Sequence, residues 1–437
     1  MKRKFEKTLN EWLEDNDRKP LIVSGARQIG KTYLINKFCL EHSKKYIHFD
    51  FIKQTDALEN ANIDDFNTLK ETLQIAYNFR FDNPDTIVFF DEIQEAPNLI
   101  KNLKYLKLEY PHSKIICSGS LLGVEFRKMK ISFPVGYVRP ETMYQMDFEE
   151  FLYAIGDERF IPIIEDCYNN NKAINEAFHK ILIEDYYKYL FLGGMPEVIQ
   201  NFIDNDKALE KMNILKIKDI VDIYEQDMTK YVYNETESLR IRRIYDNIIP
   251  QLSKGNPKFT FAKLDLKDNR KSDYISAIDW LTSSNIIYKC DQVTKPEYPL
   301  KAYEDDSSYK LYMNDTGILN YIAEIKPTDI LLDSDYSFKG KLAENYVAQQ
   351  LKANQLNIFY YSEKNKGNDA MEIDFLLQLN GNIVPIEVKA KDKTQSKILN
   401  SYMDKFKSKY AIRISTKNFG FANNIKSVPL YATFCIK

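Results

Sequence analysis

Eight consecutive residues near the N-terminus constrain the fold of this 437-residue chain more than any other feature. Residues 25–32 read Gly-Ala-Arg-Gln-Ile-Gly-Lys-Thr and match the pattern G-x-x-x-x-G-K-[ST] without a departure. An apolar run at residues 21–24 precedes them, and helical periodicity follows toward Leu40. A strand, a glycine-rich loop and a helix in this order predict a phosphate-binding loop, or P-loop, within an α/β sheet.

The motif assigns separate tasks to the residues of the loop. Gly25 and Gly30 let the backbone wrap closely, so that N–H groups and the N-terminus of the following helix face phosphate oxygens. Lys31 is expected to reach the β and γ phosphates of ATP, and Thr32 to bind Mg²⁺. We expect every residue of the loop to contact the nucleotide: Gly25, Ala26, Arg27, Gln28, Ile29, Gly30, Lys31 and Thr32.

A second apolar run completes the predicted nucleotide site. Residues 87–90 are Ile-Val-Phe-Phe, and Asp91 and Glu92 follow them directly. A buried central strand would bring Asp91 to the Mg²⁺ ion and place Glu92, as the catalytic residue, to polarise the attacking water. Ser118 follows a similar strand and is either a polar sensor of the γ-phosphate or part of a simple turn. The sequence therefore predicts that the chain binds ATP and Mg²⁺.

Changes in periodicity divide the chain into segments. Residues 1–150 alternate short apolar runs with helical stretches, which is typical of a parallel α/β sheet. Residues 151–243 carry helical periodicity alone and are interpreted as a helical lid and connector. Residues 306–437 form a second α/β domain, with a helix at 339–354. The predicted strands of the two α/β segments are residues 21–24, 46–51, 86–90, 114–118, 309–313, 357–361, 372–379 and 382–388.

Residues 244–305 have the element order of a winged helix, with helices before a single strand. After the first helix, the further elements are expected near residues 261–266, from Ser272, and at residues 286–293. Three apolar residues of the Ser272 helix are spaced as a core-facing stripe: Ile275, Ile278 and Leu281. Four basic side chains could meet phosphates, and a purely architectural module is the alternative: Lys263, Lys267, Arg270 and Lys271.

Asn380-Gly381, flanked by two β segments, is a strong signal for a two-residue hairpin turn. The resulting register places Asp374 opposite Glu387, with Cβ atoms ~4.5–5.5 Å apart, where like charges are destabilising unless a cation compensates. Both carboxylates are therefore candidate ligands of Mg²⁺, and Glu344 on the preceding helix could complete the metal site. Lys389 on the same face could act as a catalytic residue by stabilising charge on a phosphate. A charge-balanced pair of strands is the structural alternative.

Several short motifs, together with the P-loop, resemble the prokaryotic AAA-type P-loop ATPases that carry a C-terminal domain of unknown function. The motifs are residues 90–92 (Phe-Asp-Glu), 118–123 (Ser-Gly-Ser-Leu-Leu-Gly), 133–136 (Phe-Pro-Val-Gly), 148–151 (Phe-Glu-Glu-Phe) and 193–197 (Gly-Gly-Met-Pro-Glu). This resemblance covers nearly the whole chain and implies an AAA-type ATPase domain. The order Glu344, Asp374, Glu387 and Lys389 resembles the PD-(D/E)xK nuclease superfamily, which implies a restriction-endonuclease-like C-terminal domain.

Charge leaves two interpretations of the function open. The chain has 61 Lys and Arg against 63 Asp and Glu, so no basic field covers it as a whole. Residues 381–437, however, carry 11 basic and 3 acidic side chains, which could contact the backbone of DNA. We expect an ATPase that acts on DNA through the nuclease-like domain. The alternative is a nucleotide-switched regulatory or scaffold ATPase whose C-terminal domain binds a partner without cleaving anything.

Composition also bears on where the chain resides. No apolar run approaches the ~18 residues of a membrane helix. Five dispersed cysteines, without a Cys-x-x-Cys pair, suit a reducing compartment. We therefore expect a cytoplasmic protein without a membrane partner, whose oligomeric state the sequence leaves open.

Overall fold

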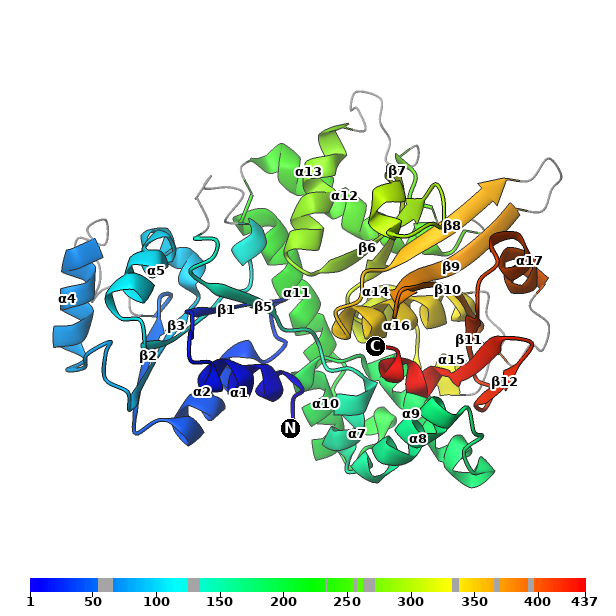
Figure 1. Cartoon of the computed structure of the whole chain (residues 1–437), viewed down its shortest axis with the longest axis horizontal. Coiled ribbons are helices and arrows are strands. Elements are labelled where there is room, and N and C mark those ends of the chain that lie inside the picture. The colour runs from blue at the N-terminus through cyan, green and yellow to red at the C-terminus, as the bar shows by residue number, and fades with distance from the viewer. Residues whose placement is uncertain are drawn as a thin grey trace. The chain divides into compact units, whose positions relative to one another are not determined.

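The computed structural model describes residues 1–53, 66–124, 134–232, 234–254, 258–261, 272–331, 338–364, 370–391 and 397–437. These residues form two compact units, and Figure 1 labels their helices and strands. The N-terminal unit consists of Lys2–Tyr144 together with Ser283–Asn285, and the C-terminal unit consists mainly of Gln145–Thr282 and Ile286–Lys437. Within the described ranges, no helix is long and apolar enough to cross a membrane.

A parallel sheet in the order β2-β3-β4-β1-β5 forms the centre of the N-terminal unit. Its strands are β1 (Leu21–Ser24), β2 (Lys45–Asp50), β3 (Thr86–Asp91), β4 (Lys114–Ser118) and β5 (Arg139–Thr142). All neighbouring strands run parallel. The prediction of a parallel α/β sheet is confirmed, and β1 to β4 agree with the expected strands within one residue at each end.

Helices of the N-terminal unit bury this sheet. They are α1 (Phe5–Glu14), α2 (Lys31–His42), α4 (Phe66–Ala76), the 3-10 turn η1 (Ile93–Glu95) and α5 (Pro97–Glu109). Every residue of β3 is buried, as expected for a central parallel strand. Val88 and Phe90 of β3 share one hydrophobic cluster with Leu99 and Leu103 of α5. Asp91, at the end of β3, is thus held at the rim of a rigid core.

Helices also dominate the first part of the C-terminal unit, as the periodicity of residues 151–243 predicted. They are α7 (Phe148–Ile155), α8 (Ile161–Asn170), α9 (Glu176–Leu192), α10 (Pro196–Asp204), α11 (Leu215–Lys230) and α12 (Glu235–Leu252). A capping box begins α7, because the side chain of Asp147 accepts a hydrogen bond from Glu150 N and that of Glu150 accepts one from Asp147 N. The family motif at residues 148–151 therefore coincides with a helix start.

α13 (Ser272–Ser283) begins where the sequence predicted, but its core face is different. Ile278 and Leu281 are buried, whereas Ile275 is 49% exposed, so the predicted stripe is wrong at that position. Tyr274 and Ala277 are buried instead, because residues 274, 277, 278 and 281 lie on one continuous helix face. Residues 262–266 of the helix expected near residues 261–266 lie outside the described residues, as do the basic side chains of Lys263, Lys267, Arg270 and Lys271.

A mixed sheet in the order β12-β13-β11-β10-β9-β8-β6-β7 forms the centre of the C-terminal unit (Figure 1). Its strands are β6 (Ile287–Val293), β7 (Glu304–Met313), β8 (Phe359–Lys364), β9 (Ala370–Leu379), β10 (Asn382–Val388), β11 (Ala411–Ser415), β12 (Gly420–Ala422) and β13 (Ile425–Pro429). β6, the strand expected in the winged-helix-like segment, pairs with β7 and β8. The predicted segments 244–305 and 306–437 therefore contribute strands to the same sheet.

β9 and β10 form the predicted hairpin. Asn380 and Gly381 have φ angles of 48° and 75°, the positive values that a two-residue type I′ turn requires. The register pairs Leu379 with Asn382 and continues to Phe375 with Ile386. The predicted register of the hairpin is thus confirmed, and Asp374 and Glu387 follow the last of these pairs.

Four further helices and two short 3-10 segments accompany the sheet: α14 (Thr316–Ile322), α15 (Pro327–Leu331), α16 (Lys339–Ala353), α17 (Lys397–Phe406), η5 (Leu300–Tyr303) and η6 (Leu430–Cys435). Asp315 caps the N-terminus of α14 and also accepts a hydrogen bond from Gly194 N at 2.6 Å. A Cβ atom at Gly193 would overlap the Asp315 side chain. The close approach of this carboxylate therefore explains Gly193, and a Cβ atom at Gly194 would overlap the carbonyl oxygen of Met146.

Candidate functional site

The residues of the predicted P-loop form a tight turn between β1 and α2. Gly25 and Gly30 have φ angles of 146° and 85°, and Gln28 has a φ of 65°. A Cβ atom at Gly25 would overlap the carbonyl oxygen of Met143, so only glycine fits there. Gly30 is the N-cap of α2, and Lys31 opens the helix. The local geometry therefore brings backbone N–H groups to a helix N-terminus, where partial positive charge favours an anion.

Lys31 is nearly buried within this loop. Its Nζ donates hydrogen bonds to Gly25 O at 3.0 Å and Ala26 O at 2.8 Å. The Oγ of Ser120 lies 3.5 Å from the same nitrogen. The ammonium group is thus located at the phosphate-binding loop, as predicted, and Ser120 is its neighbour from the segment after β4.

Arg3 supports the P-loop and was not anticipated from the sequence. Its Nη1 donates to Ile29 O and its Nη2 donates to Tyr144 O, each at 2.7 Å. Arg3 is 7% exposed, so these bonds are largely shielded from water. An arginine that lies 26 residues before its loop partner carries no local signal of this role.

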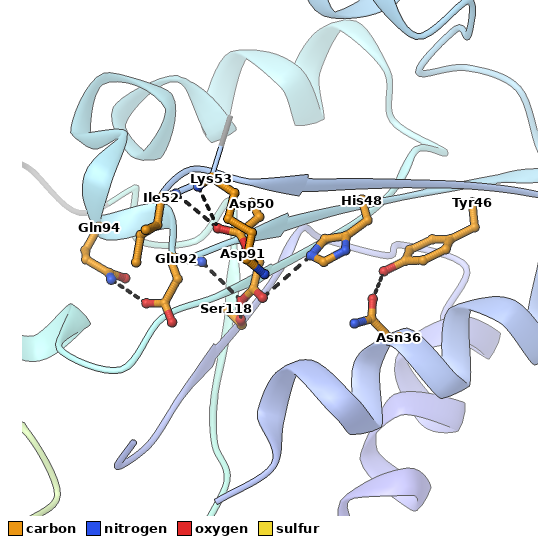
Figure 2. Close-up of polar contacts among 10 residues, drawn as sticks. All are labelled: Asn36, Tyr46, His48, Asp50, Ile52, Lys53, Asp91, Glu92, Gln94 and Ser118. Carbon is orange, nitrogen blue, oxygen red and sulfur yellow. Dashed lines mark hydrogen bonds and ion pairs between the residues drawn. The ribbon is translucent and has the colours of Figure 1, made fainter. Parts of the chain in front are cut away.

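Asp91 lies at the centre of a polar cluster at the end of β3 (Figure 2). Ser118 Oγ donates a hydrogen bond to its Oδ1, and Glu92 N donates to the same atom at 3.1 Å. His48 Nε2 lies 3.6 Å from its Oδ2. Burial favours the neutral acid, but the nearby side chains of His48, Ser118 and Thr32 outweigh it and lower the pKa of Asp91. Asp91 is therefore held as an anion.

Glu92 directly follows β3, and its backbone leaves the extended conformation of the strand. Its φ is 53°, in the left-handed region, and Gln94 Nε2 donates to its Oε2 at 2.5 Å (Figure 2). Gln94 is 3% exposed and comes from η1. The carboxylate expected to polarise water is thus oriented by a buried amide, a contact that the sequence did not reveal.

His48 is a further residue that sequence reasoning missed. It pairs with Phe89 in the β2–β3 register, and the two rings stack with centroids 4.9 Å apart. Ile47 and Phe49 are buried in the opposite face of β2, so alternation along the strand turns His48 away from that core. Strand periodicity could have predicted this orientation, but not the approach to Asp91, which needs the order of the strands.

The predicted residues at this site suit a magnesium nucleotide. The Thr32 hydroxyl hydrogen-bonds to the Asp91 carboxylate, so two hard oxygen donors from α2 and β3 are neighbours. Magnesium prefers oxygen ligands of this kind. The loop, Lys31, Asp91, Glu92 and Ser118 are all brought together in one unit, and the donor set fits Mg²⁺ beside a phosphate.

The predicted acidic cluster of the C-terminal unit contains an additional cation. Lys310 of β7 is buried, and its Nζ lies 3.1 Å from Glu344 Oε1 and 2.8 Å from Glu372 Oε1. Tyr312 donates to Glu344 Oε1 at 2.5 Å, and Lys341 Nζ lies 2.9 Å from its Oε2. Burial would raise the pKa of Glu344, but Lys310 and Lys341 overcome this effect and lower it. Glu344 is thus a charged carboxylate whose negative charge is compensated by lysines.

Asp374 and Glu387 belong to the same electrostatic network. Asp374 Oδ2 accepts a hydrogen bond from Val388 N at 2.8 Å, while burial and the Glu344 carboxylate raise its pKa to about 6. Glu387 Oε1 pairs with Lys389 Nζ at 3.0 Å. Its Oε2 is buried without a hydrogen-bond partner in the described part of the chain. The structure therefore brings Glu344, Asp374, Glu387 and Lys389 into one region, as predicted.

Metal coordination in this region has less support. In the described ranges, no group of three or more His, Cys, Asp or Glu side chains is placed to hold a metal ion. Lys310 lies between Glu344 and Glu372 and supplies positive charge there. Lysines balance the acids of this region in the described structure. Glu344, Asp374 and Glu387 remain predicted metal ligands.

Models of three known families match parts of the chain. Residues 17–152 match a family described as an AAA domain. Residues 183–329 and 339–433 match two families described as domains of unknown function, DUF8612 and DUF4143. The N-terminal unit therefore contains an AAA-type P-loop domain, which confirms this part of the resemblance. The other two descriptions name no activity, so the nuclease-like interpretation remains a prediction.

Individual relatives are distant. An uncharacterized protein of Methanocaldococcus jannaschii is 22% identical over 237 residues, which cover 51% of this chain and 48% of that protein. The chain thus spans about half the length of the curated relative that it matches. A Walker-type ATPase of Pyrococcus abyssi has a TM-score of 0.43 and 17% identity, with 74% of this chain and 95% of that chain covered. The ORC2 protein of Aeropyrum pernix has a TM-score of 0.34 and 13% identity, with 75% and 92% covered.

Proposed function

We propose that the N-terminal unit binds ATP with Mg²⁺ and hydrolyses it. The observation that carries this proposal is the convergence of Thr32, Ser118 and His48 on the buried carboxylate of Asp91 beside the P-loop. Hydrogen bonds that keep Asp91 anionic prepare it for a hard cation rather than for a structural salt bridge. Phosphoryl transfer needs oriented backbone N–H groups, a lysine and a carboxylate that remains charged.

Different residues of the site would have different roles in the reaction. When bound, Mg²⁺ neutralises phosphate charge, and Thr32 and Asp91 would hold it. Lys31 and the N–H groups of the loop bind the β and γ phosphates and fix their orientation. Glu92, oriented by Gln94, accepts a hydrogen bond from the attacking water and aligns it with the γ-phosphate. Ser118 supports this arrangement by holding Asp91 in place.

Removal of the Lys31 ammonium tests nucleotide binding. We expect Lys31→Ala to weaken binding of a fluorescent ATP analogue by about a hundredfold, because it removes a charge-assisted contact to the phosphates. Lys37→Ala is the matched control, since Lys37 lies on the same helix and pairs with Glu6 at the surface. Equal affinity of wild type and Lys31→Ala would contradict the proposal.

For the C-terminal unit, we propose an action on DNA through a nuclease-like domain. The confirmed hairpin register and the placement of Asp374, Glu387 and Lys389 in one network support it. The unpartnered Oε2 of Glu387 is an oxygen that a cation could use. The basic balance of residues 381–437 suits a phosphate backbone. The winged-helix-like segment of residues 244–305, which contributes β6 to the sheet, belongs to the same proposal as a further DNA contact.

The alternative, recognition of a partner without cleavage, is favoured by Lys310. Its buried ammonium already compensates Glu344 and Glu372, which leaves less need for a metal ion. In this alternative, nucleotide turnover in the N-terminal unit would regulate a C-terminal domain with a purely structural acidic cluster. A cytoplasmic location is part of both proposals and is supported by five cysteines that all remain unpaired thiols.

Cleavage assays on the full chain separate the two. Linear, nicked and branched DNA would be incubated with Mg²⁺ or Mn²⁺, with and without ATP. The nuclease proposal expects metal-dependent products that disappear in Lys389→Ala and persist in Lys301→Ala, which removes an exposed lysine elsewhere. Absence of metal-dependent products on every substrate would leave the partner-binding alternative.

A further inference from the structure

A polar pocket of the C-terminal unit lies at the turn end of the β9–β10 hairpin. Its volume is about 520 Å³, and it is lined by Tyr168 of α8, Asn380 of the turn, Tyr410, and Lys426 of β13. Lys437 and Glu165 complete its charged lining. The six residues from Asp374 to Asn380 span roughly 20 Å of strand, so the pocket is separate from the acidic cluster.

Lys426 is the unusual residue of this pocket. Its Nζ lies 3.4 Å from the centroid of the Tyr168 ring. Among the described residues its ammonium makes no hydrogen bond and no ion pair, although it is half-buried. Burial lowers the pKa of Lys426, and no carboxylate opposes this effect. A partly desolvated cation that lacks an anion is costly to the fold, and an anionic ligand would offset that cost.

The other residues that line the pocket indicate which chemical groups an anionic ligand would carry. The ammonium of Lys426, which has no ion pair among the described residues, is the group of the lining that favours an anion, and Lys437 adds a second ammonium. Tyr410 offers an aromatic face on which a base can stack, and Asn380 offers an amide that can hydrogen-bond a base edge. The volume falls within the roughly 300–1,000 Å³ of small-molecule sites. These features together fit a phosphate carried by a nucleoside.

We propose that this pocket binds a nucleotide through its phosphate at Lys426 and Lys437. The phosphate could belong to a free mononucleotide or to a DNA strand, because both present the same chemistry. The pocket shares no residue with the P-loop or with the acidic cluster. It therefore does not depend on the functions proposed for those sites.

The test uses the full chain with Lys31→Ala, which weakens binding at the P-loop. Calorimetric titration with AMP, adenosine, inorganic phosphate and a 5′-phosphorylated single-stranded oligonucleotide distinguishes the sources of the phosphate. Lys426→Met in this background should weaken binding about tenfold, since one charge-assisted contact is lost. Lys301→Met, which removes an exposed lysine outside the pocket, should leave affinity unchanged. Lys437→Met changes an exposed side chain, so it can test the pocket without disturbing the fold.

The outcomes decide between the possibilities. Binding of AMP but not adenosine, lost in Lys426→Met or weakened in Lys437→Met, would establish the site for a free nucleotide. Binding of the oligonucleotide alone, with the same dependence, would establish it for DNA. The proposal would be overturned if AMP, phosphate and the oligonucleotide all failed to bind. It would also be overturned if they bound both lysine variants as tightly as the Lys301→Met control.

Discussion

Two aspartates of sheet strands, Asp91 at the end of β3 in the N-terminal unit and Asp374 within β9 in the C-terminal unit, have opposite electrostatics. Asp91 receives hydrogen bonds from a hydroxyl and a backbone N–H, an imidazole lies beside it, and its pKa is lowered. Asp374 faces burial and the Glu344 carboxylate, and its pKa is raised to about 6. The surroundings of Asp91 keep it charged, so that it can lie beside a cation. The charged form of Asp374, in contrast, is stabilised by lysines of the fold.

This difference shows how one residue type serves two purposes. Around Asp91 the neighbours are mainly neutral donors, so a bound cation would add the missing positive charge. Around Asp374 the positive charge is already present in Lys310, Lys341 and Lys389. We therefore expect perturbation of the first site to affect activity, and perturbation of the second to affect stability and its dependence on pH.

The largest effect is expected at Glu92. Glu92→Gln should reduce phosphate release from ATP by about a hundredfold or more, because the amide cannot polarise water as the carboxylate does. Affinity for the fluorescent ATP analogue should stay close to that of the wild type. Turnover of the variant at the wild-type rate would remove Glu92 from the reaction.

Lys310 should be the most sensitive residue of the C-terminal unit. Lys310→Met leaves the buried carboxylate of Glu344 and the partly exposed carboxylate of Glu372 without their common cation, and it should lower the free energy of unfolding by about 3–5 kcal/mol. Urea denaturation with Lys301→Met as the exposed-lysine control measures this effect. If added Mn²⁺ restores the stability of Lys310→Met, the acids can bind a metal ion. A loss below that of the control would show that Lys310 does not hold the cluster together.

The two aspartates should also differ in the sign of their pH dependence. The pKa of Asp374 is higher in the folded state, so deprotonation between about pH 4 and pH 6 destabilises the fold by about 2 kcal/mol. Asp374→Asn should remove this loss. The free energy of unfolding of the variant, measured relative to the wild type, should therefore be higher at pH 7 than at pH 4. Asp315, whose pKa burial also raises to about 6, contributes equally to wild type and variant and cancels in their difference.

Asp91 should show the reverse dependence. Because its pKa is lowered in the folded state, it stabilises the fold above its ordinary pKa, and this stabilisation is lost as the pH falls. Asp91→Asn should therefore destabilise the protein near pH 7 more than near pH 3. Urea unfolding at several pH values provides the comparison, and parallel curves for Asp91→Asn and Asp374→Asn would refute the proposed difference.

The smallest effect is expected at His48. His48→Gln removes a ring that approaches Asp91 and should weaken Mg²⁺-dependent ATP binding by about tenfold. His42→Gln is a matched control, since His42 lies at the end of α2 and its Nδ1 contacts Phe38 O. Unchanged Mg²⁺ dependence in His48→Gln would limit this residue to a packing role.

Local patterns explain which parts could be predicted from the sequence. The P-loop and the Asn380-Gly381 turn depend on a few adjacent residues, so motif and spacing were sufficient for them. Ile275 was assigned wrongly, because helical spacing alone does not decide which of two overlapping faces meets the core. Arg3, His48 and Lys310 reach their partners from elements distant in sequence. Their roles follow from strand order and tertiary packing, which residue spacing does not contain.

The most direct test of the account is phosphate release from ATP by the purified wild-type chain and by Asp91→Asn, each with Mg²⁺ and with EDTA. Because Asp91 is held charged beside Thr32, we predict steady, Mg²⁺-dependent release by the wild type that is lost in Asp91→Asn. Release by the wild type that does not exceed that of Asp91→Asn, or that is insensitive to EDTA, would contradict the central claim that this site hydrolyses ATP.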